Sequence, residues 1–427
     1  MPGYHDAMST ASPVTVLPDH DETSVLNRVR NLENEYLLQN YARYPLVLDR
    51  GKGCYVFDPS GHRYLDFITG IGVNALGHAH PRLVKVIREQ AGRLLHSSNL
   101  YYHAYQGPLA ERLAKASGLQ RTFFCNSGAE SMEGAMKMAR AHGHKIHPDK
   151  YEIVALHNSF HGRTLGALSI TGQEKYRVDF EPLLPGARFV PPNDEVALEQ
   201  VVSDRTAGIV LELIQGEGGI FPMSSEYIRK ARELADRYDA LLVFDEIQCG
   251  VGRVGKHFAY QLFDPIVLPD VMVAAKPLAC GIPLGVIVAN ERAAQSIGSG
   301  MHGSTFGGGP LACRVALEFM DILDPLLPHI DEMGRYFRAQ LQELQKQFSF
   351  IREVRGQGLM IGVELSFPGK QIVLDALEQG LLINCTHETV LRFLPPYIAT
   401  EKEINRAVAI LKRVFKLAVK RGDAHAD

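Results

Sequence analysis

Short apolar runs alternate with helical patterns from about residue 80 to residue 310, and this alternation constrains the fold more than any other feature of the sequence. Apolar runs of this kind are typical of strands that are covered on both faces. Strands that alternate with helices predict an α/β layer with a largely parallel sheet. The expected strands are Glu152–Leu156, Gly208–Leu213, Ala240–Asp245, Val271–Ala274 and Leu284–Ala289.

A second, smaller domain is expected towards the C-terminal end, because 427 residues are too many for one hydrophobic core. Past about residue 320 the pattern is helix, then the β-like Gly362–Leu365, then helix again. Ser224, and the pair Thr400 and Glu403, predict the N-terminal caps of two amphipathic helices. We therefore expect a flexible tail (1–22), a segment that packs with the small domain (23–79), a large domain (80–320) and a small α+β domain (321–427).

Composition argues against several classes of partner. The formal charge is −3, which gives no sign of nucleic-acid binding, and no apolar run approaches the roughly 20 residues of a membrane span. The six cysteines form no CxxC pair and no HExxH motif occurs, so we expect neither a disulfide framework nor a metal site. The first residues have no secretory pattern. We expect a cytoplasmic protein that acts on small molecules.

Polar side chains follow four of the expected strands. In an open α/β sheet, ligands gather at the carboxyl ends of the strands, so these groups are the candidates for a site. An aromatic ring, an arginine, carboxylates and a lysine should converge on one crevice. The segments that carry them are His157–Arg163, Gln215–Gly219, Asp245–Gln248 and Ala275–Pro277.

Lys276 is the most informative of these residues. It leaves an apolar run just before Pro277, and desolvation there would lower the pKa of its amine and favour Schiff-base chemistry. Taken alone, the position also fits a lysine that buries its stem and extends its amine into water. Asp245, which ends another apolar run, could cap a loop or keep a pyridoxal ring nitrogen protonated. Together, the two residues fit a pyridoxal site better than either does alone.

A phosphate site is predicted at Asn126–Glu130, which directly precedes a helical pattern. Small residues there allow backbone N–H groups and the Ser127 hydroxyl to point at an anion from a helix N-terminus. An ordinary helix start with Ser127 or Asn126 as N-cap explains the same residues equally well. A second small and polar run, His302–Gly309, could supply another hydroxyl.

Other candidates have two interpretations each. Phe160 is either plain core or a ring that stacks on a cofactor. Arg163 and Arg392 are either carboxylate-binding arginines or members of structural salt bridges. The run Gly250–Gly255 matches the GxGxxG pattern of dinucleotide-binding folds, but Asp245–Cys249 separates it from its strand and no long helical pattern follows. A nicotinamide site is therefore the weaker hypothesis.

Taken in order, these motifs resemble the class III aminotransferases, the ornithine/ω-amino family of fold-type I pyridoxal-phosphate enzymes. The resemblance runs from about residue 36 to residue 415, and three further segments are most similar to the acetylornithine branch of the family: Asn99–Leu113, Val354–Leu365 and Ile383–Pro396. It implies a large domain with a mostly parallel seven-stranded sheet and a smaller α+β domain. The motifs that carry it are Asn126–Glu130, Phe160–Thr164, Gln215–Gly219, Asp245–Gln248 with Gly250–Gly255, Ala275–Lys276 and Gly303–Gly308.

The resemblance implies pyridoxal 5'-phosphate as cofactor and a role for each matching residue. Lys276 would hold the cofactor and move the reacting proton, Asp245 would pair with the pyridine nitrogen, and Gln248 would lie near the ring hydroxyl. Phe160 would stack on the ring. The phosphate would be bound by Ser127, Gly128 and Ala129, and by Thr305 from the partner subunit of a homodimer.

The substrate is also implied by the resemblance. Arg163 would bind the remote carboxylate of the donor and Arg392 the α-carboxylate of glutamate or 2-oxoglutarate, while Glu217 would pair with Arg392 whenever an ω-amine is bound; Ser304 completes the substrate-binding set. The expected donor is N2-acetylornithine. The rivals are ornithine, succinylornithine, N-succinyl-diaminopimelate, 4-aminobutyrate, putrescine or, in another reaction class, an aminomutase. The residues that depart from the family pattern are Cys249, Pro277, Cys280 and Gly309.

Overall fold

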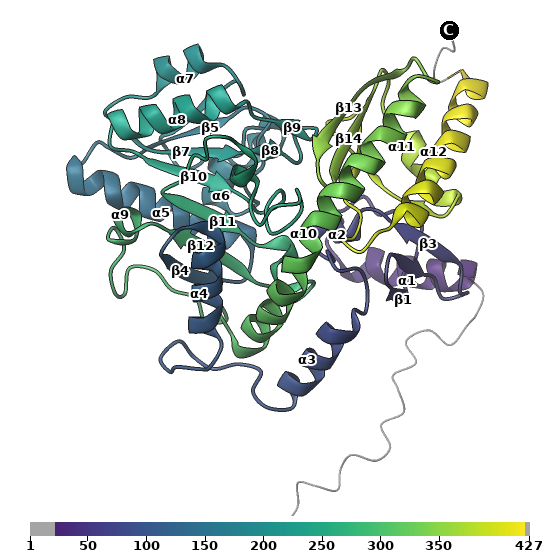
Figure 1. The fold of residues 1–427 in the computed structure, drawn as a ribbon, viewed down its shortest axis with the longest axis horizontal. Coiled ribbons are helices and arrows are strands. Elements are labelled where there is room, and N and C mark those ends of the chain that lie inside the picture. The colour runs from purple at the N-terminus through teal and green to yellow at the C-terminus, as the bar shows by residue number, and fades with distance from the viewer. Residues whose placement is uncertain (1–21, 423–427) are drawn as a thin grey trace, which may run out of the picture.

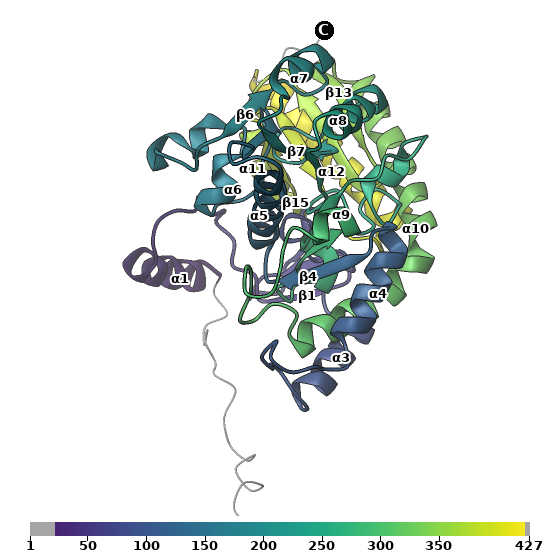
Figure 2. The same cartoon turned by 90° about the vertical axis from the view of Figure 1, so that its left-hand side faces the viewer.

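The computed structural model describes residues 22–422. Two lobes of unequal size are visible in Figure 1, and the long helix α10 (Pro310–Gln345) runs from the larger lobe to the smaller one. The tail expected for residues 1–22 lies outside the described residues, except that residue 22 begins helix α1 (Glu22–Tyr36). Figure 2 shows α1 projecting from the side of the molecule.

The larger lobe is built on a seven-stranded sheet in the order β4-β12-β11-β10-β7-β5-β6. Neighbouring strands are parallel from β11 to β6, and β12 is antiparallel to both of its neighbours. The expected α/β fold with a mostly parallel sheet is therefore confirmed. The strands are β4 (Arg121–Cys125), β5 (Glu152–Leu156), β6 (Ala187–Val190), β7 (Thr206–Glu212), β10 (Leu241–Asp245), β11 (Val271–Ala274) and β12 (Gly285–Ala289).

The five strands expected from the sequence are all present, whereas the two edge strands, β4 and β6, were missed. Every residue of β7, β10 and β12 is buried. An edge strand is covered less completely, so β4 begins with the exposed Arg121 and β6 contains the exposed Arg188. Arg188 interrupts the apolar run of β6, and Arg121 shortens that of β4, so neither shows the pattern by which a buried strand is recognised.

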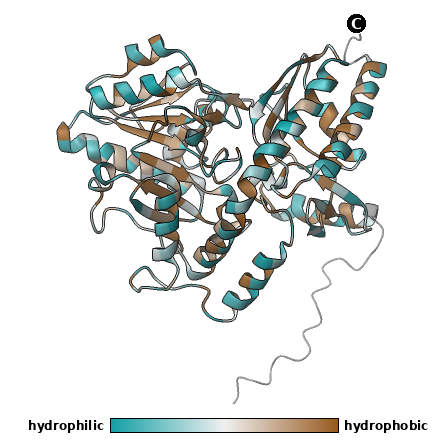
Figure 3. Cartoon of the chain, viewed as in Figure 1, coloured by the Kyte–Doolittle hydropathy of each residue, from teal (hydrophilic) through white to brown (hydrophobic). Residues whose placement is uncertain are grey.

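Helices cover both faces of the sheet, and the side chains of β10 show how. Leu242 and Phe244 join the hydrophobic cluster that contains the buried residues of α8 (Ser225–Arg237). Leu241 and Val243 join the cluster that contains those of α5 (Gly128–Ile146). Figure 3 shows the result, with hydrophobic strands between helices whose outer faces are hydrophilic.

The smaller lobe contains a four-stranded antiparallel sheet, β13-β14-β17-β16, and shares a second sheet, β1-β2-β3-β15, with the N-terminal segment. The predicted domain boundary at residue 320 falls inside α10, so the division into four segments stays a proposal. The strands are β1 (Arg50–Lys52), β2 (Tyr55–Phe57), β3 (Arg63–Asp66), β13 (Ile351–Gln357), β14 (Met360–Leu365), β15 (Leu381–Leu382), β16 (Asn384–Thr386) and β17 (Val390–Phe393).

Both predicted helix caps are confirmed. Ser224 accepts the N–H of Tyr227 at the start of α8, at 3.1 Å, and Thr400 and Glu403 form the capping box of α12 (Glu401–Arg421). Within residues 22–422 no helix combines the length and the apolar character of a membrane span. The other described elements are α2 (Thr69–Gly72), α3 (Pro81–Ala91), α4 (Gln106–Ser117), α6 (Leu165–Ser169), η1 (Glu174–Tyr176), η2 (Val178–Phe180), α7 (Glu195–Val201), β8 (Ile214–Gln215), β9 (Phe221–Pro222), η3 (Ala259–Leu262), η4 (Lys276–Ala279), α9 (Glu291–Ala294) and α11 (Lys370–Glu378).

Candidate active site

Lys276 stands where the central strand β11 ends and the short helix η4 begins. Burial is the largest influence on its amine and lowers its pKa, although the nearby carboxylates act in the opposite direction. An amine with a lowered pKa is more readily uncharged, which is the form that reacts as a nucleophile. The charged groups that act on it come from four separate segments and are Glu212, Glu217, Asp245 and Arg392.

Asp245 ends the neighbouring strand β10 and is only 3% exposed. Its Oδ2 lies 2.7 Å from Nδ1 of His161, and its Oδ1 accepts the N–H of Ile247 at 3.0 Å. Burial by itself lowers the pKa of His161, but the hydrogen bond and the charge of Asp245 outweigh it, so the pKa is raised. A buried carboxylate that is held in place by a histidine is suited to bind a positively charged ring nitrogen.

Arg392 and Glu217 form an ion pair that joins the two lobes. Nη1 of Arg392 lies 2.5 Å from Oε1 of Glu217, and the same guanidinium donates to Gln248 at 3.2 Å and to Asn384 at 3.1 Å. Arg392 lies on β17 and is 1% exposed. Burial raises the pKa of Glu217, but the charges of Arg392 and Lys276 and the hydrogen bonds from Arg392 and Thr386 together outweigh burial and lower it.

The N-terminus of α5 forms a narrow cradle. Ser127 is the N-cap and accepts the N–H of Glu130 at 3.2 Å, so its own hydroxyl hydrogen is free to donate. Gly128 is packed so closely that a Cβ there would lie 2.8 Å from the side chain of Ile247. A Cβ on Gly162, in the loop after β5, would lie 2.9 Å from Ala129. Backbone N–H groups at a helix start between such small residues suit a phosphate.

Ser304 and Thr305 lie in the loop before α10 but face different surroundings. Oγ of Ser304 accepts from Nδ2 of Asn126 at 3.2 Å, which ties the loop to the cradle, and from the N–H of Gly307 at 2.9 Å. Thr305 is exposed. The structure therefore brings Ser304 to the site of this chain and leaves Thr305 on the surface.

Phe160 and Arg163 follow β5 and both contact Tyr176, the ring of Phe160 edge to face. The guanidinium of Arg163 lies 3.8 Å from the ring centroid of Tyr176 and 5.3 Å from that of Phe160. The backbone N–H of Phe160 donates to Glu212 at 2.9 Å, so the ring is anchored to the sheet. Arg163 is exposed and makes no ion pair with any residue in the described part of the chain.

Glu212, His161 and Tyr176 were not predicted to be site residues. Glu212 had a usable signal, because it is an acidic residue at the end of an otherwise apolar strand. His161 belongs to a predicted motif, but nothing local shows that it contacts Asp245, which is 84 residues away. Tyr176 lies in η1, where the sequence shows no distinctive pattern.

The group implied by the resemblance, pyridoxal 5'-phosphate, fits the residues that are present. A lysine with a lowered pKa, a buried acid for the ring nitrogen and a cradle for the phosphate lie at the ends of adjacent elements. The run Gly250–Gly255, by contrast, starts no helix: the next described element is the short η3. Its Arg253 is fully buried and donates to the carbonyls of Leu359 and Pro395 at 3.1 and 2.6 Å.

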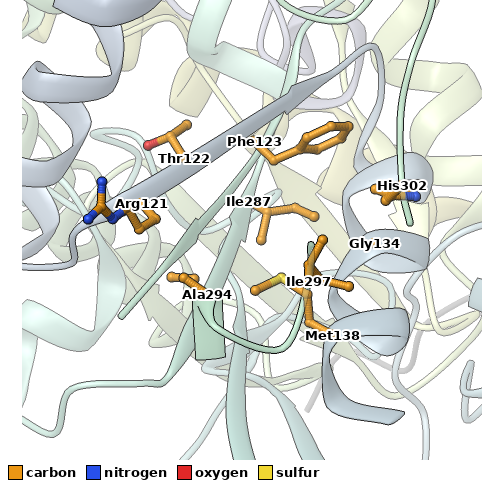
Figure 4. Close-up of a pocket in the computed structure, with 10 residues that line it drawn as sticks. Arg121, Thr122, Phe123, Gly134, Met138, Ile287, Ala294, Ile297 and His302 are labelled. Atoms are coloured by element: carbon orange, nitrogen blue, oxygen red, sulfur yellow. The ribbon is translucent and has the colours of Figure 1, made fainter. Parts of the chain in front are cut away.

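An apolar pocket of about 150 Å³ lies elsewhere, between β4, β12 and α5 (Figure 4). Phe123, Ile287 and Met138 line it, with His302 at its edge. Gly134 allows this close approach, because a Cβ there would lie 2.3 Å from Ile287. The lining residues include no carboxylate and no lysine, so the pocket lacks the chemistry found around Lys276.

Comparison with known proteins gives consistent matches. The class III aminotransferase family model matches residues 36–415. The acetylornithine aminotransferase of Methanocaldococcus jannaschii is 47% identical over 388 residues, which cover 90% of this chain and 97% of that protein. Among solved structures, the ornithine aminotransferase of Toxoplasma gondii ME49 is 33% identical with a TM-score of 0.88, covering 93% of this chain and 96% of that chain. The N-acetylornithine aminotransferase of Stenotrophomonas maltophilia K279a is 36% identical with a TM-score of 0.79, covering 92% and 99%.

Proposed function

Because the chain belongs to the class III aminotransferases, we propose that it transfers the terminal amino group of N2-acetylornithine to 2-oxoglutarate. The products are N-acetylglutamate semialdehyde and glutamate, as in arginine biosynthesis. Enzymes of this family depend on pyridoxal 5'-phosphate, which is therefore the cofactor. Relatives from several organisms that are 42–47% identical over about 90% of this chain carry the name acetylornithine aminotransferase, which supports this donor.

The ion pair between Glu217 and Arg392 is the observation that carries the proposal. A donor that reacts at its terminal amine brings no carboxylate to the reacting carbon, so Glu217 stays on Arg392. Glutamate brings an α-carboxylate, which takes the place of Glu217 on the buried guanidinium. The lowered pKa of Glu217 keeps this side chain ionised and able to return. One site thereby accepts two different substrates in turn.

The other residues hold the cofactor and move one proton. Pyridoxal 5'-phosphate supplies an electron sink when it is bound. We assign to Nζ of Lys276 the attachment of the cofactor and, once released, the transfer of the proton at the substrate carbon that bears the amine. Asp245 would hold the ring nitrogen, Phe160 would cover the ring and Gln248 would lie near the ring hydroxyl. The phosphate is held by Ser127, Gly128 and Ala129.

We also propose a cytoplasmic homodimer whose sites are shared between subunits. Thr305 is exposed in this chain, as expected for a residue that reaches the phosphate held by the partner subunit. Large apolar side chains beside it are exposed too, with Leu100 at 85% and Phe306 at 67%. Exposed apolar surface of this extent is typical of an interface. Arg163, which is exposed and lies over the ring of Tyr176, is the proposed contact for the donor's remote carboxylate. Ser304, whose Oγ accepts from Asn126, is the other proposed substrate-binding residue.

The first experiment is a titration of the purified holoenzyme with N2-acetylornithine, ornithine and 4-aminobutyrate, followed by the visible absorbance of the cofactor. We expect the band to convert at the lowest concentration with N2-acetylornithine. Conversion by ornithine alone would keep the reaction class and replace the donor, which the fold shared with an ornithine aminotransferase makes the leading alternative.

Lys276→Ala tests the assignment of the catalytic residue. We expect the visible band of the attached cofactor to disappear and turnover to fall by at least about 10²-fold, because the proton-transfer group is lost. Lys256→Ala, at an exposed lysine in the same lobe, should leave the visible band and the turnover unchanged. An active Lys276→Ala enzyme would rule out the assigned role.

A further inference from the structure

Glu212, Asp245 and His161 form a buried cluster of ionisable groups beside the candidate site. Their exposed fractions are 5%, 3% and 2%. Asp245 and Glu212 are register partners on the parallel strands β10 and β7, so their side chains leave the same face of the sheet. His161 approaches from the loop after β5 and lies 2.7 Å from Asp245. The reaction described above uses Asp245 but assigns nothing to Glu212.

Glu212 also holds two segments of the site in place. One of its carboxyl oxygens accepts the N–H of Phe160 at 2.9 Å, and the other accepts the N–H of Gly216 at 3.1 Å. Phe160 is the ring proposed to cover the cofactor, and Gly216 directly precedes Glu217. Glu212 therefore connects the stacking ring with the loop that carries the proposed switch.

Two buried carboxyl groups side by side oppose each other's ionisation. Burial raises the pKa of Glu212, and the charge of Asp245 adds to this rise. The charge of His161 and the hydrogen bonds from the N–H groups of Phe160 and Gly216 act against it, but the pKa stays raised. Burial lowers the pKa of His161, but the hydrogen bond and charge of Asp245 and the charge of Glu212 together raise it. The remaining groups that face the cluster are the amine of Lys276 after β11, the carboxyl group of Glu246 and the thiol of Cys249, whose pKa burial raises far above its usual range.

We propose that Glu212 is a positioning residue that carries the proton of this cluster, so that Asp245 keeps its ion pair with His161 although a second carboxyl group lies beside it. The inference rests on the proposed cofactor site, because Asp245 is the acid assigned to the ring nitrogen. As the pH rises, Glu212 loses its proton and adds a negative charge beside Asp245. The environment of the cofactor then changes with pH through a residue that does not touch the substrate.

The test compares the holoenzyme with Glu212→Gln, in the absence of any amino donor, by visible and infrared absorbance as a function of pH. Glutamine cannot ionise at any pH, and its single oxygen can accept only one of the two N–H groups that Glu212 binds. The lost hydrogen bond gives a constant difference between the visible spectra of the two proteins, and the titration of Glu212 should add a difference that changes with pH. The carbonyl band of a protonated carboxylic acid, present in the wild-type protein at low pH, should be weaker in Glu212→Gln by one group.

Glu246→Gln is the matched control, because Glu246 follows Asp245 directly, is fully buried and has a pKa raised by burial to about 7. It bonds instead to the N–H groups of Ala259 and Tyr260, at 2.8 and 3.0 Å. This variant should lose its own carbonyl band and change the pH dependence of the visible spectrum less than Glu212→Gln does, because Asp245 is the weakest of the influences on the pKa of Glu246.

His161→Asn is a second and independent variant, because the charge of His161 lowers the pKa of Glu212. Its removal should let the Glu212 carbonyl band persist to higher pH. A spectral difference between the wild-type protein and Glu212→Gln that is equal at every pH would show a purely structural role and overturn the proposal, as would a wild-type infrared spectrum without the Glu212 band. The spectra are recorded without an amino donor, so an error in the proposed donor leaves this outcome unaffected.

Discussion

Arg392 is among the largest side chains that are fully buried in the described chain. A buried guanidinium without a partner is strongly unfavourable, and here three acceptors surround it: Glu217, Gln248 and Asn384. A substrate carboxylate that binds Arg392 must therefore take the place of one of these three acceptors. At the scale of the residue, this exchange is what gives the site two specificities.

Glu217→Gln tests the exchange. Neutralising Glu217 weakens its hold on Arg392 while leaving the guanidinium free for a dicarboxylate, so we expect kcat/KM for the ω-amine to fall by at least about tenfold, or ~1.4 kcal/mol. The value of kcat/KM for the half-reaction with glutamate should fall much less. Single-turnover kinetics give the ratio of the rates of the two half-reactions. The control is Glu353→Gln, which changes an exposed glutamate of the small lobe and should leave this ratio unchanged. Equal losses in both half-reactions would argue against a switch.

The residues after Lys276 depart from the small, glycine-rich pattern of the family, and the backbone accommodates them. Pro277 occupies the first turn of η4, where a backbone N–H would have no acceptor within the helix, so the lack of an N–H in proline costs no hydrogen bond. Cys280 ends the same turn with φ of 43°, in the left-handed region that favours glycine. Gly309, another departure, is the N-cap of α10 and has no side chain to cap it. Lys276 still stands at the end of β11.

At the scale of the element, α5 combines two functions. Its buried residues, including Met132, Ala135 and Ala139, pack on the sheet, and its N-terminus forms the proposed phosphate cradle. Ile247, two residues after Asp245, presses against Gly128 at this end. The position of the cradle is therefore coupled to the turn that carries the acid for the ring nitrogen.

Gly128→Ala should disturb both groups. The new Cβ would lie 2.8 Å from Ile247 and displace it, and overpacking of this kind costs about 1–3 kcal/mol. We expect the dissociation constant of pyridoxal 5'-phosphate to rise by at least about fivefold, measured by absorbance titration of the apoenzyme. Gly107→Ala on α4 is the control, because nothing lies within 4 Å of its Cβ position. An unchanged affinity in Gly128→Ala would place the phosphate elsewhere.

At the scale of the whole molecule, two loops that are far apart in the sequence form one exposed apolar surface. Hydrogen bonds tie them together: Asn99 donates to Gly307 O at 3.1 Å, and Gln106 donates to Gly308 O at 2.9 Å. Leu100 and Tyr102 protrude from the first loop, with Tyr102 fully exposed. Since Thr305 lies in the second loop, the same surface would carry both the subunit contact and the shared part of the site.

Leu100→Glu should separate the subunits. A charge placed in an apolar interface should weaken association by about 2 kcal/mol or more, or roughly 30-fold. Sedimentation velocity would then show monomer at low concentration, and the affinity for the cofactor should fall with it because Thr305 is withdrawn. Val196→Glu, on the outer helix α7 with 66% of its side chain exposed, should remain dimeric. A monomeric wild-type protein would contradict the proposal.

The sequence by itself determined the elements whose signal lies among neighbouring residues. The buried strands β5, β10 and β11, the caps at Ser224 and Thr400, and the position of Lys276 at the end of a strand all follow from local patterns, because period and capping depend on residues a few positions apart. The resemblance to the family added proposed roles for individual residues, because several specific motifs occur in the same order as in the family. Edge strands were missed because partial exposure interrupts their apolar runs.

Only the tertiary structure decided which distant side chains meet. Glu217 and Arg392 are 175 residues apart, and their contact depends on how the small-lobe strand β17 packs against a loop of the large lobe. Glu212 lies beside Asp245 because of the register between β7 and β10. Strand register and lobe packing are set by the whole core and leave no local pattern, so the sequence could propose Lys276 and Asp245 but could not show the buried cluster that surrounds them.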